Sequence, residues 1–200
     1  MTLDPSDLRL RIDEAFGGMP YPGDEQIVTH NRGDCSECER TQNALKGLYW
    51  RDLSFEILDH QREALTFMSP EGFRFYLPAF MIFSIMDYYR ADLIPVVVVG
   101  RLTLPCASDL SDFGWTRDQI DAFPAMEPLS SIDWERVKEK IAGFYGSDEG
   151  EHWFFERVSG FNEAQCKVIR QFLEHMRDAH GEDFMNREPE RAIERYWHLF

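Results

Sequence analysis

Apolar residues recur every three or four positions along almost the whole chain. This spacing is typical of amphipathic helices, in which such positions share one face. The clearest stripe runs through Cys166, Ile169, Phe172, Leu173 and Met176. The pattern predicts helices over residues 4–16, 34–50, 69–88, 131–144, 162–176 and 188–200, two short helices between 54 and 68, and one near 116–119.

Three segments carry the residues that begin helices. Asp4-Pro5 and Ser69-Pro70 each place a capping side chain before a proline, whose fixed φ suits the first helical turn. Asn162 and Gln165 have the spacing of a capping box, in which each side chain bonds the other residue's backbone N–H.

The segment from Phe73 to Tyr88 is apolar on nearly every side, which predicts a central, buried helix. Pro78 lies inside it and is expected to kink or split it, because proline lacks the N–H that a helix needs. The aromatic run 73–80 either packs in the core or lines a ligand pocket.

Residues 93–99 are ambiguous, because four consecutive valines favour a strand whereas Asp92 and Pro95 suit the start of a helix. No other segment offers an obvious strand partner, so we favour a helix. The predicted fold class is mainly α: a single-domain, irregular helical bundle over residues 1–200, with a loop-rich connection at about 101–130 and at most one or two short strands.

Composition limits the classes of function that the protein can have. A chain of 200 residues that is 44% hydrophobic can bury one sizeable core. The net charge of −15 repels nucleic acid, and it either attracts a basic protein partner or only keeps the protein soluble. The N-terminus lacks signal-peptide character and no apolar stretch reaches membrane-spanning length, so we expect a cytoplasmic protein without a membrane partner. The oligomeric state stays open.

Cys35 and Cys38 are the strongest candidates in the sequence for chemically active residues. In a helix capped by Asp34, two thiols three residues apart share one face, and the helix N-terminus favours a thiolate. His30 lies just upstream. These three residues could bind zinc, but a fourth ligand would have to come from afar. We therefore expect no cofactor, with zinc as the alternative.

Two other interpretations of the thiols remain. Thiol–disulfide exchange matches a Cys-x-x-Cys at a helix start, although the flanking acids Asp34, Glu37 and Glu39 oppose thiolate formation and the strand pattern of a thioredoxin is missing. Alternatively, Cys38 packs in the core and Cys35 is a chance neighbour.

No other constellation in the sequence indicates catalysis. Phosphate-binding glycine loops and the Gly-x-Ser-x-Gly and His-Glu-x-x-His motifs are absent from it. His175, His180 and the carboxylates around them could bind a divalent cation, but they fit the charged end of a helix better. The sequence therefore leans away from an enzyme.

Several motifs together resemble a bacterial family of uncharacterised proteins. They are Cys35-x-x-Cys38-Glu39, Trp50, the run 69–80 with its Phe-Arg-Phe-Tyr-Leu-Pro-Ala-Phe core, and the run 161–165. The resemblance covers roughly residues 30 to 176. It implies a small helical bacterial protein and brings no activity, cofactor or catalytic residue.

The leading hypothesis is a non-catalytic, acidic binding protein with an immunity-like role, which neutralises a basic protein partner through its charge. The alternative is a metal-binding or thiol-redox protein that uses Cys35 and Cys38.

Overall fold

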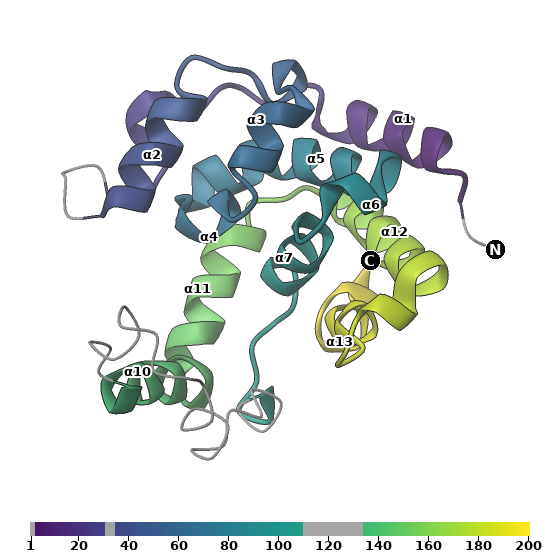
Figure 1. Cartoon of the computed structure of the whole chain (residues 1–200). Coiled ribbons are helices and arrows are strands. Elements are labelled where there is room, and N and C mark those ends of the chain that lie inside the picture. Colours follow the sequence, from purple (N-terminus) through teal and green to yellow (C-terminus); the bar gives the residue numbers. More distant parts are fainter. Residues whose placement is uncertain (1–2, 31–34, 110–133) are drawn as a thin grey trace. The chain divides into compact units, whose positions relative to one another are not determined.

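The computed structural model describes residues 3–30, 35–109 and 134–200, and it is mainly helical, as predicted (Figure 1). Contacts divide the chain into two compact units, Met1–Thr103 with Phe155–Phe200, and Leu104–Phe154. The helices are α1 (Pro5–Phe16), α2 (Ser36–Leu45), α3 (Phe55–His60), α4 (Ala64–Phe67), α5 (Pro70–Met86), α6 (Tyr88–Ala91), α7 (Ile94–Arg101), α10 (Trp134–Gly146), α11 (Asp148–Val158), α12 (Glu163–His180) and α13 (Glu188–Arg195). Short 3₁₀ turns are η1 (Asp24–Gln26), η2 (Trp50–Asp52), η3 (Gly181–Asp183) and η4 (Trp197–Leu199). None of the helices in the described part of the chain combines the length and apolar character that crossing a membrane requires.

The three predicted helix starts are confirmed. The Asp4 carboxylate accepts the Ser6 N–H at 2.8 Å, and the Ser69 hydroxyl accepts the Gly72 N–H at 3.0 Å. Asn162 and Gln165 form the full capping box, with both hydrogen bonds at 3.0 Å. Each cap satisfies an N–H that the first helical turn leaves without an intrahelical partner.

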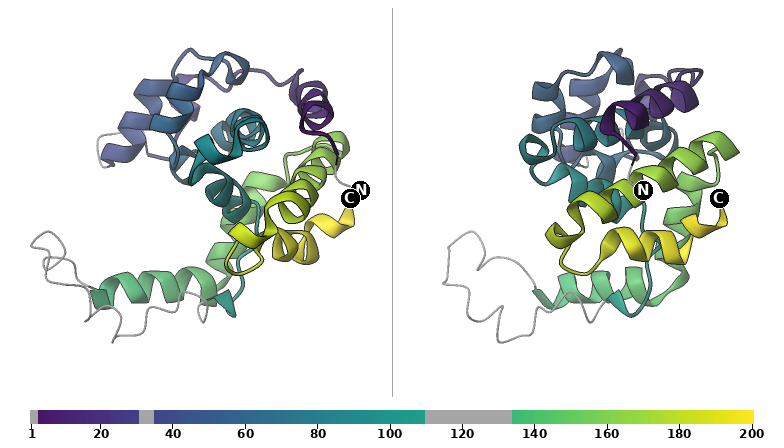
Figure 2. Two further views of the ribbon diagram at one scale, coloured as in Figure 1. Left: turned by 45° about the vertical axis from the view of Figure 1, so that its right-hand side comes forward. Right: turned by 90° about the vertical axis from the view of Figure 1, so that its right-hand side faces the viewer.

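Helix α5 forms the centre of the larger unit, in contact with α1, α3, α7 and α12. Figure 2 shows α1 and α12 side by side next to it. The aromatic run is core: Phe73, Phe75, Tyr76 and Phe80 are buried. The helix continues unbroken through Pro78, so the expected split is wrong. Burial on nearly all sides stabilises α5 against the loss of a single hydrogen bond.

The valine-rich segment is a helix, as favoured. Pro95 lies in the first turn of α7, where its missing N–H costs nothing, and Val98 and Val99 are buried. Asp92 separates α6 from α7 with a φ of 51°, a left-handed conformation that breaks the chain direction between the two helices.

Extended pairing is limited to one antiparallel bridge between Val28 and Met68, so the described ranges contain no strand. The bridge is held by hydrogen bonds of 3.1 Å from Thr29 N to Phe67 O and from Ser69 N to Ile27 O. It fixes the segment after η1 against the start of α5.

Helix α2 is shorter than its apolar stripe suggested. It ends at Leu45 rather than near Trp50, and Gly47 follows with a φ of 71°. The Tyr76 hydroxyl lies 2.9 Å from both the Leu45 and Leu48 carbonyl oxygens, which satisfies backbone groups at this end. The stop therefore combines a local glycine with a hydroxyl from the core of α5, which lies far away in the sequence.

The smaller unit contains α10 and most of α11. The expected helix near residues 116–119 and most of the loop-rich connection lie outside the described residues. The single-domain organisation remains a prediction.

Candidate functional site

The thiol pair lies at the N-terminus of α2. Cys35 is the N-cap residue, and its Sγ accepts a 3.3 Å hydrogen bond from the backbone N–H of Cys38. Asp34, the predicted cap, lies outside the described residues. A thiol therefore occupies the position where helices commonly carry an oxygen acceptor.

The two sulfur atoms differ in their surroundings. Cys35 is partly exposed, whereas Cys38 is 1% exposed. Burial, followed by the neighbouring Cys35 thiol, raises the pKa of Cys38 to about 11. His30 Nδ1 lies 3.8 Å from Cys38 Sγ. The pair thus combines an accessible thiol with a buried thiol that is protonated at neutral pH.

A carboxylate borders the accessible thiol. Glu37 Oε2 lies 3.9 Å from Cys35 Sγ and accepts the Ser36 hydroxyl at 2.8 Å. The Ser36 hydrogen bond lowers the pKa of Glu37, so this group is negative at neutral pH. One of the acids predicted to flank the thiols thus lies beside Cys35.

The zinc interpretation lacks a closed ligand set. Across the described ranges, no group of three or more His, Cys, Asp or Glu side chains is arranged to hold a metal ion. Cys166 is buried in α12, and Cys106 belongs to the smaller unit. His60, on α3, directs Nδ1 to the Glu56 carbonyl oxygen at 2.7 Å. Among the residues that the structure describes, His30, Cys35 and Cys38 are therefore not joined by the further ligands that a zinc site needs.

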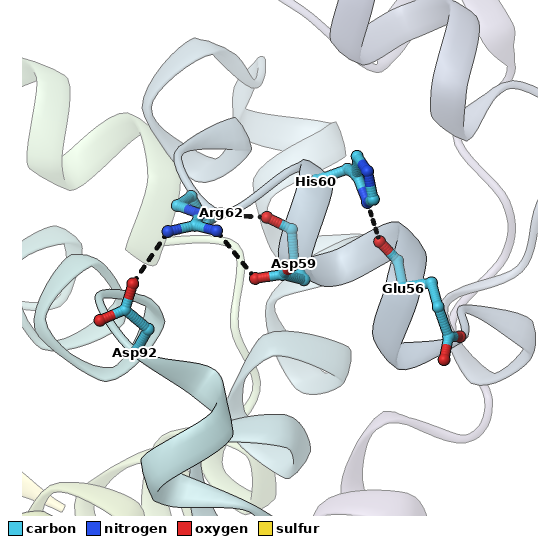
Figure 3. Close-up of polar contacts among 5 residues, drawn as sticks. All are labelled: Glu56, Asp59, His60, Arg62 and Asp92. Carbon is cyan, nitrogen blue, oxygen red and sulfur yellow. Dashed lines mark hydrogen bonds and ion pairs between the residues drawn. The ribbon is translucent and has the colours of Figure 1, made fainter.

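A second polar cluster joins α3 to the turn after α6 (Figure 3). The Arg62 guanidinium lies 2.9 Å from the carboxylates of both Asp59 and Asp92. All three side chains are substantially exposed, so the pairs contribute little to stability individually. The geometry anchors Asp92 at its unusual φ, and we assign the cluster a structural role.

The structure contains a buried charged side chain that the sequence does not predict. Arg157 is 3% exposed, and its Nη2 donates to the Met68 carbonyl oxygen at 2.8 Å. Burial, and next the charge of Arg101, lowers the pKa of Arg157 to about 10. This arginine ties the end of α11 to the bridge segment before α5. The amphipathic pattern of the sequence carries no signal for it, because arginine is rarely buried.

His175, His180 and the carboxylates around them lie at the boundary of the core. The His180 ring stacks on Tyr88 with centroids 3.5 Å apart, and His175 is buried on α12. Burial is the main cause that lowers the pKa of both histidines, which disfavours their charged forms. The arrangement fits the predicted charged helix end rather than a cation site.

Comparison with known proteins identifies a family but no activity. A family model, described as a family of unknown function (DUF6714), matches residues 5–110, more than half of the chain. No curated protein and no solved structure matches. The matched segment includes Cys35, Cys38 and the aromatic run of α5 but ends before residues 161–165. The chain therefore belongs to the DUF6714 family, whose function is unknown.

Proposed function

We propose that the protein is a thiol–disulfide exchange protein that uses Cys35 and Cys38 as a reversible pair. The observation that carries this proposal is the position of Cys35, partly exposed at a helix N-terminus with its sulfur accepting the Cys38 N–H. Such a hydrogen bond and the partial positive charge of the helix end favour a thiolate over a thiol. The Glu37 carboxylate lies 3.9 Å from the Cys35 sulfur and borders the same face of the helix start.

The exchange proceeds in two steps. The Cys35 thiolate attacks one sulfur of a partner disulfide, which forms a mixed disulfide and releases the other partner sulfur as a thiolate. Cys38 then loses its proton and attacks Cys35 Sγ, which forms the Cys35–Cys38 disulfide and releases the second partner thiolate. The pair loses two electrons and the partner disulfide gains them. His30 Nδ1, 3.8 Å from Cys38 Sγ, is a candidate acceptor for the Cys38 proton.

A redox titration tests this proposal. The protein is equilibrated in glutathione buffers with an increasing ratio of oxidised to reduced glutathione. We expect its mass to fall by that of two hydrogen atoms. Mass spectra of its peptides should then show one disulfide, between Cys35 and Cys38. Cys35→Ser and Cys38→Ser should each abolish the transition. Cys106→Ser removes an exposed cysteine of the smaller unit and should leave it unchanged. A wild-type protein that stays reduced, or that links Cys106 instead, would contradict the proposal.

A second candidate function rests on charge. Ion pairs within the chain engage basic side chains on many elements of the described structure, namely Arg9, Arg51, Arg62, Arg74, Arg90, Lys167, Arg170, Arg177 and Arg187. Acidic residues outnumber basic ones by 36 to 21, so such pairing leaves a surplus of carboxylates. Exposed examples are Asp7, Glu14 and Glu39. We propose on this basis that the protein also binds a basic protein and, in an immunity-like role, neutralises it.

Binding to a defined basic protein tests the second candidate. Cytochrome c, a small basic protein, is the probe, and its association rate is measured by surface plasmon resonance from 50 to 300 mM NaCl. We expect the rate to fall about tenfold or more over this range, because salt screens long-range attraction between unlike charges. An association rate that salt leaves unchanged, or no binding to the probe, would count against a charge-driven role.

A further inference from the structure

A groove of about 470 Å³ lies over the C-terminal half of α5 in the larger unit. Its floor is formed by Ala79, Ile82 and Met86, which follow one another at helical spacing and so share one face. One wall comes from η2 and α3 and a second from α1, and Arg51 of η2 joins the two through Asp13. The apolar side chains of the first wall are Trp50, Leu53, Phe55 and Leu58. A mainly apolar hollow of this size is typical of small-molecule sites.

The floor of the groove is open to solvent. Met86 is 38% exposed, and Ile82 and Phe55 are partly exposed. Exposed apolar side chains that line one hollow, rather than lying scattered over the surface, indicate a binding surface.

Positive charge is in surplus where α1 meets η2. The Arg51 guanidinium is held by three contacts: its Nε lies 3.1 Å from the Asp13 carboxylate, and its Nη1 and Nη2 donate to the carbonyl oxygens of Gly17 and Asp13. Arg9 is held loosely, with its Nε 3.8 Å from the same carboxylate and 54% of its side chain exposed. Two guanidiniums thus share one carboxylate in this part of the groove, in a protein whose net charge is −15.

Asp87 gives another part of the lining the reverse polarity. It lies 3.9 Å from Arg90, which also pairs with Glu56 at 3.3 Å. Two carboxylates share one guanidinium there. An anionic group would therefore be repelled by Asp87 and attracted to Arg9 and Arg51.

We propose that the groove binds a small apolar carboxylate, with its anionic group at Arg9 and its hydrocarbon body along the floor. The seven-residue step from Ala79 to Met86 spans about 10 Å along the helix axis, which matches an extended chain of about eight carbons. Guanidinium and carboxylate form strong charge-assisted hydrogen bonds, so Arg9 supplies selectivity for the anion. The apolar floor and walls supply the affinity for the body.

Titration with octanoate, followed by calorimetry and by the shift in melting temperature, tests this site. We expect saturable binding with a Kd of about 1 mM or below, given the small size of the ligand. Octanol and octylamine should bind at least about tenfold more weakly, because neither offers an anion to Arg9. Ile82→Trp should block the groove, with circular dichroism confirming that the variant is folded.

A matched pair of arginine variants identifies the anion contact. Arg9→Gln should weaken octanoate binding about tenfold, whereas Arg11→Gln, an exposed arginine of α1 outside the groove, should leave it unchanged. The proposal is overturned if octylamine or octanol binds as tightly as octanoate, if both arginine variants lose binding equally, or if octanoate produces no saturable signal.

Discussion

Gly72→Ala is expected to lower the free energy of unfolding by about 3 kcal/mol or more, the range of severe overpacking in a rigid site. A Cβ at Gly72 would lie 2.1 Å from the Ile27 carbonyl oxygen and 2.8 Å from the Ile27 carbonyl carbon. The contact is with backbone, so no side chain can rotate away. Urea unfolding followed by far-UV circular dichroism measures the change.

The backbone around this contact has little freedom to shift. The Ser69 hydroxyl donates to the Gln26 carbonyl oxygen at 2.5 Å, and the Ser69 N–H donates to Ile27 O at 3.1 Å. Arg157 adds a hydrogen bond to Met68 O from the end of α11. The start of α5 is therefore held against the bridge segment from several directions.

Gly100→Ala is the matched control for this prediction. Gly100 also lies in a helix, α7, but a Cβ there would meet nothing within 4 Å. Alanine has the higher helix propensity, so we expect stabilisation of about 0.5–1 kcal/mol. Equal effects of the two substitutions would show that the α5 contact is looser than the structure indicates.

Trp197→Ala should lower the free energy of unfolding by about 3–5 kcal/mol, as for other large aromatic side chains removed from a core. The Trp197 side chain is fully buried, and its indole Nε1 donates to the Leu102 carbonyl oxygen at 2.6 Å. Truncation leaves both a cavity and a buried carbonyl without this donor.

Leu199→Ala is the control, because Leu199 belongs to the same 3₁₀ turn but is 65% exposed. We expect its effect to stay within about 0.5 kcal/mol. The comparison has a consequence for the family as well. The family model ends at residue 110, yet Trp197 packs against the end of α7. If both substitutions prove equally mild in chemical denaturation, residues 155–200 do not belong to the cooperative unit of the family segment.

Helix starts were readable from the sequence because a cap is a local interaction. Asp4, Ser69 and Asn162 each bond an N–H two or three residues ahead, so the spacing in the chain is the spacing in the structure. The same reasoning correctly placed Cys35 and Cys38 within one turn at the start of a helix. It could not assign the capping role to Cys35 itself, since a neighbouring Asp is the stronger capping residue by type.

The candidate sites depended on contacts that sequence patterns do not encode. The groove is built from residues 9–13, 50–58 and 79–87, and no single segment marks it. Arg157 reaches Met68 across 89 positions of sequence, and the Tyr76 hydroxyl reaches the carbonyl oxygens of Leu48 and Leu45 from 28 and 31 positions away. Such partners become visible only when the helices are packed.

The sequence by itself determined the helical class, the central place of α5, the helix starts and the negative charge, because each follows from composition or from residues a few positions apart. The tertiary structure alone decided how the bridge locks α5, where Arg157 is buried and where a groove opens. The physical reason is that periodicity and capping act within a turn or two of chain, whereas burial and close approach depend on which distant surfaces meet.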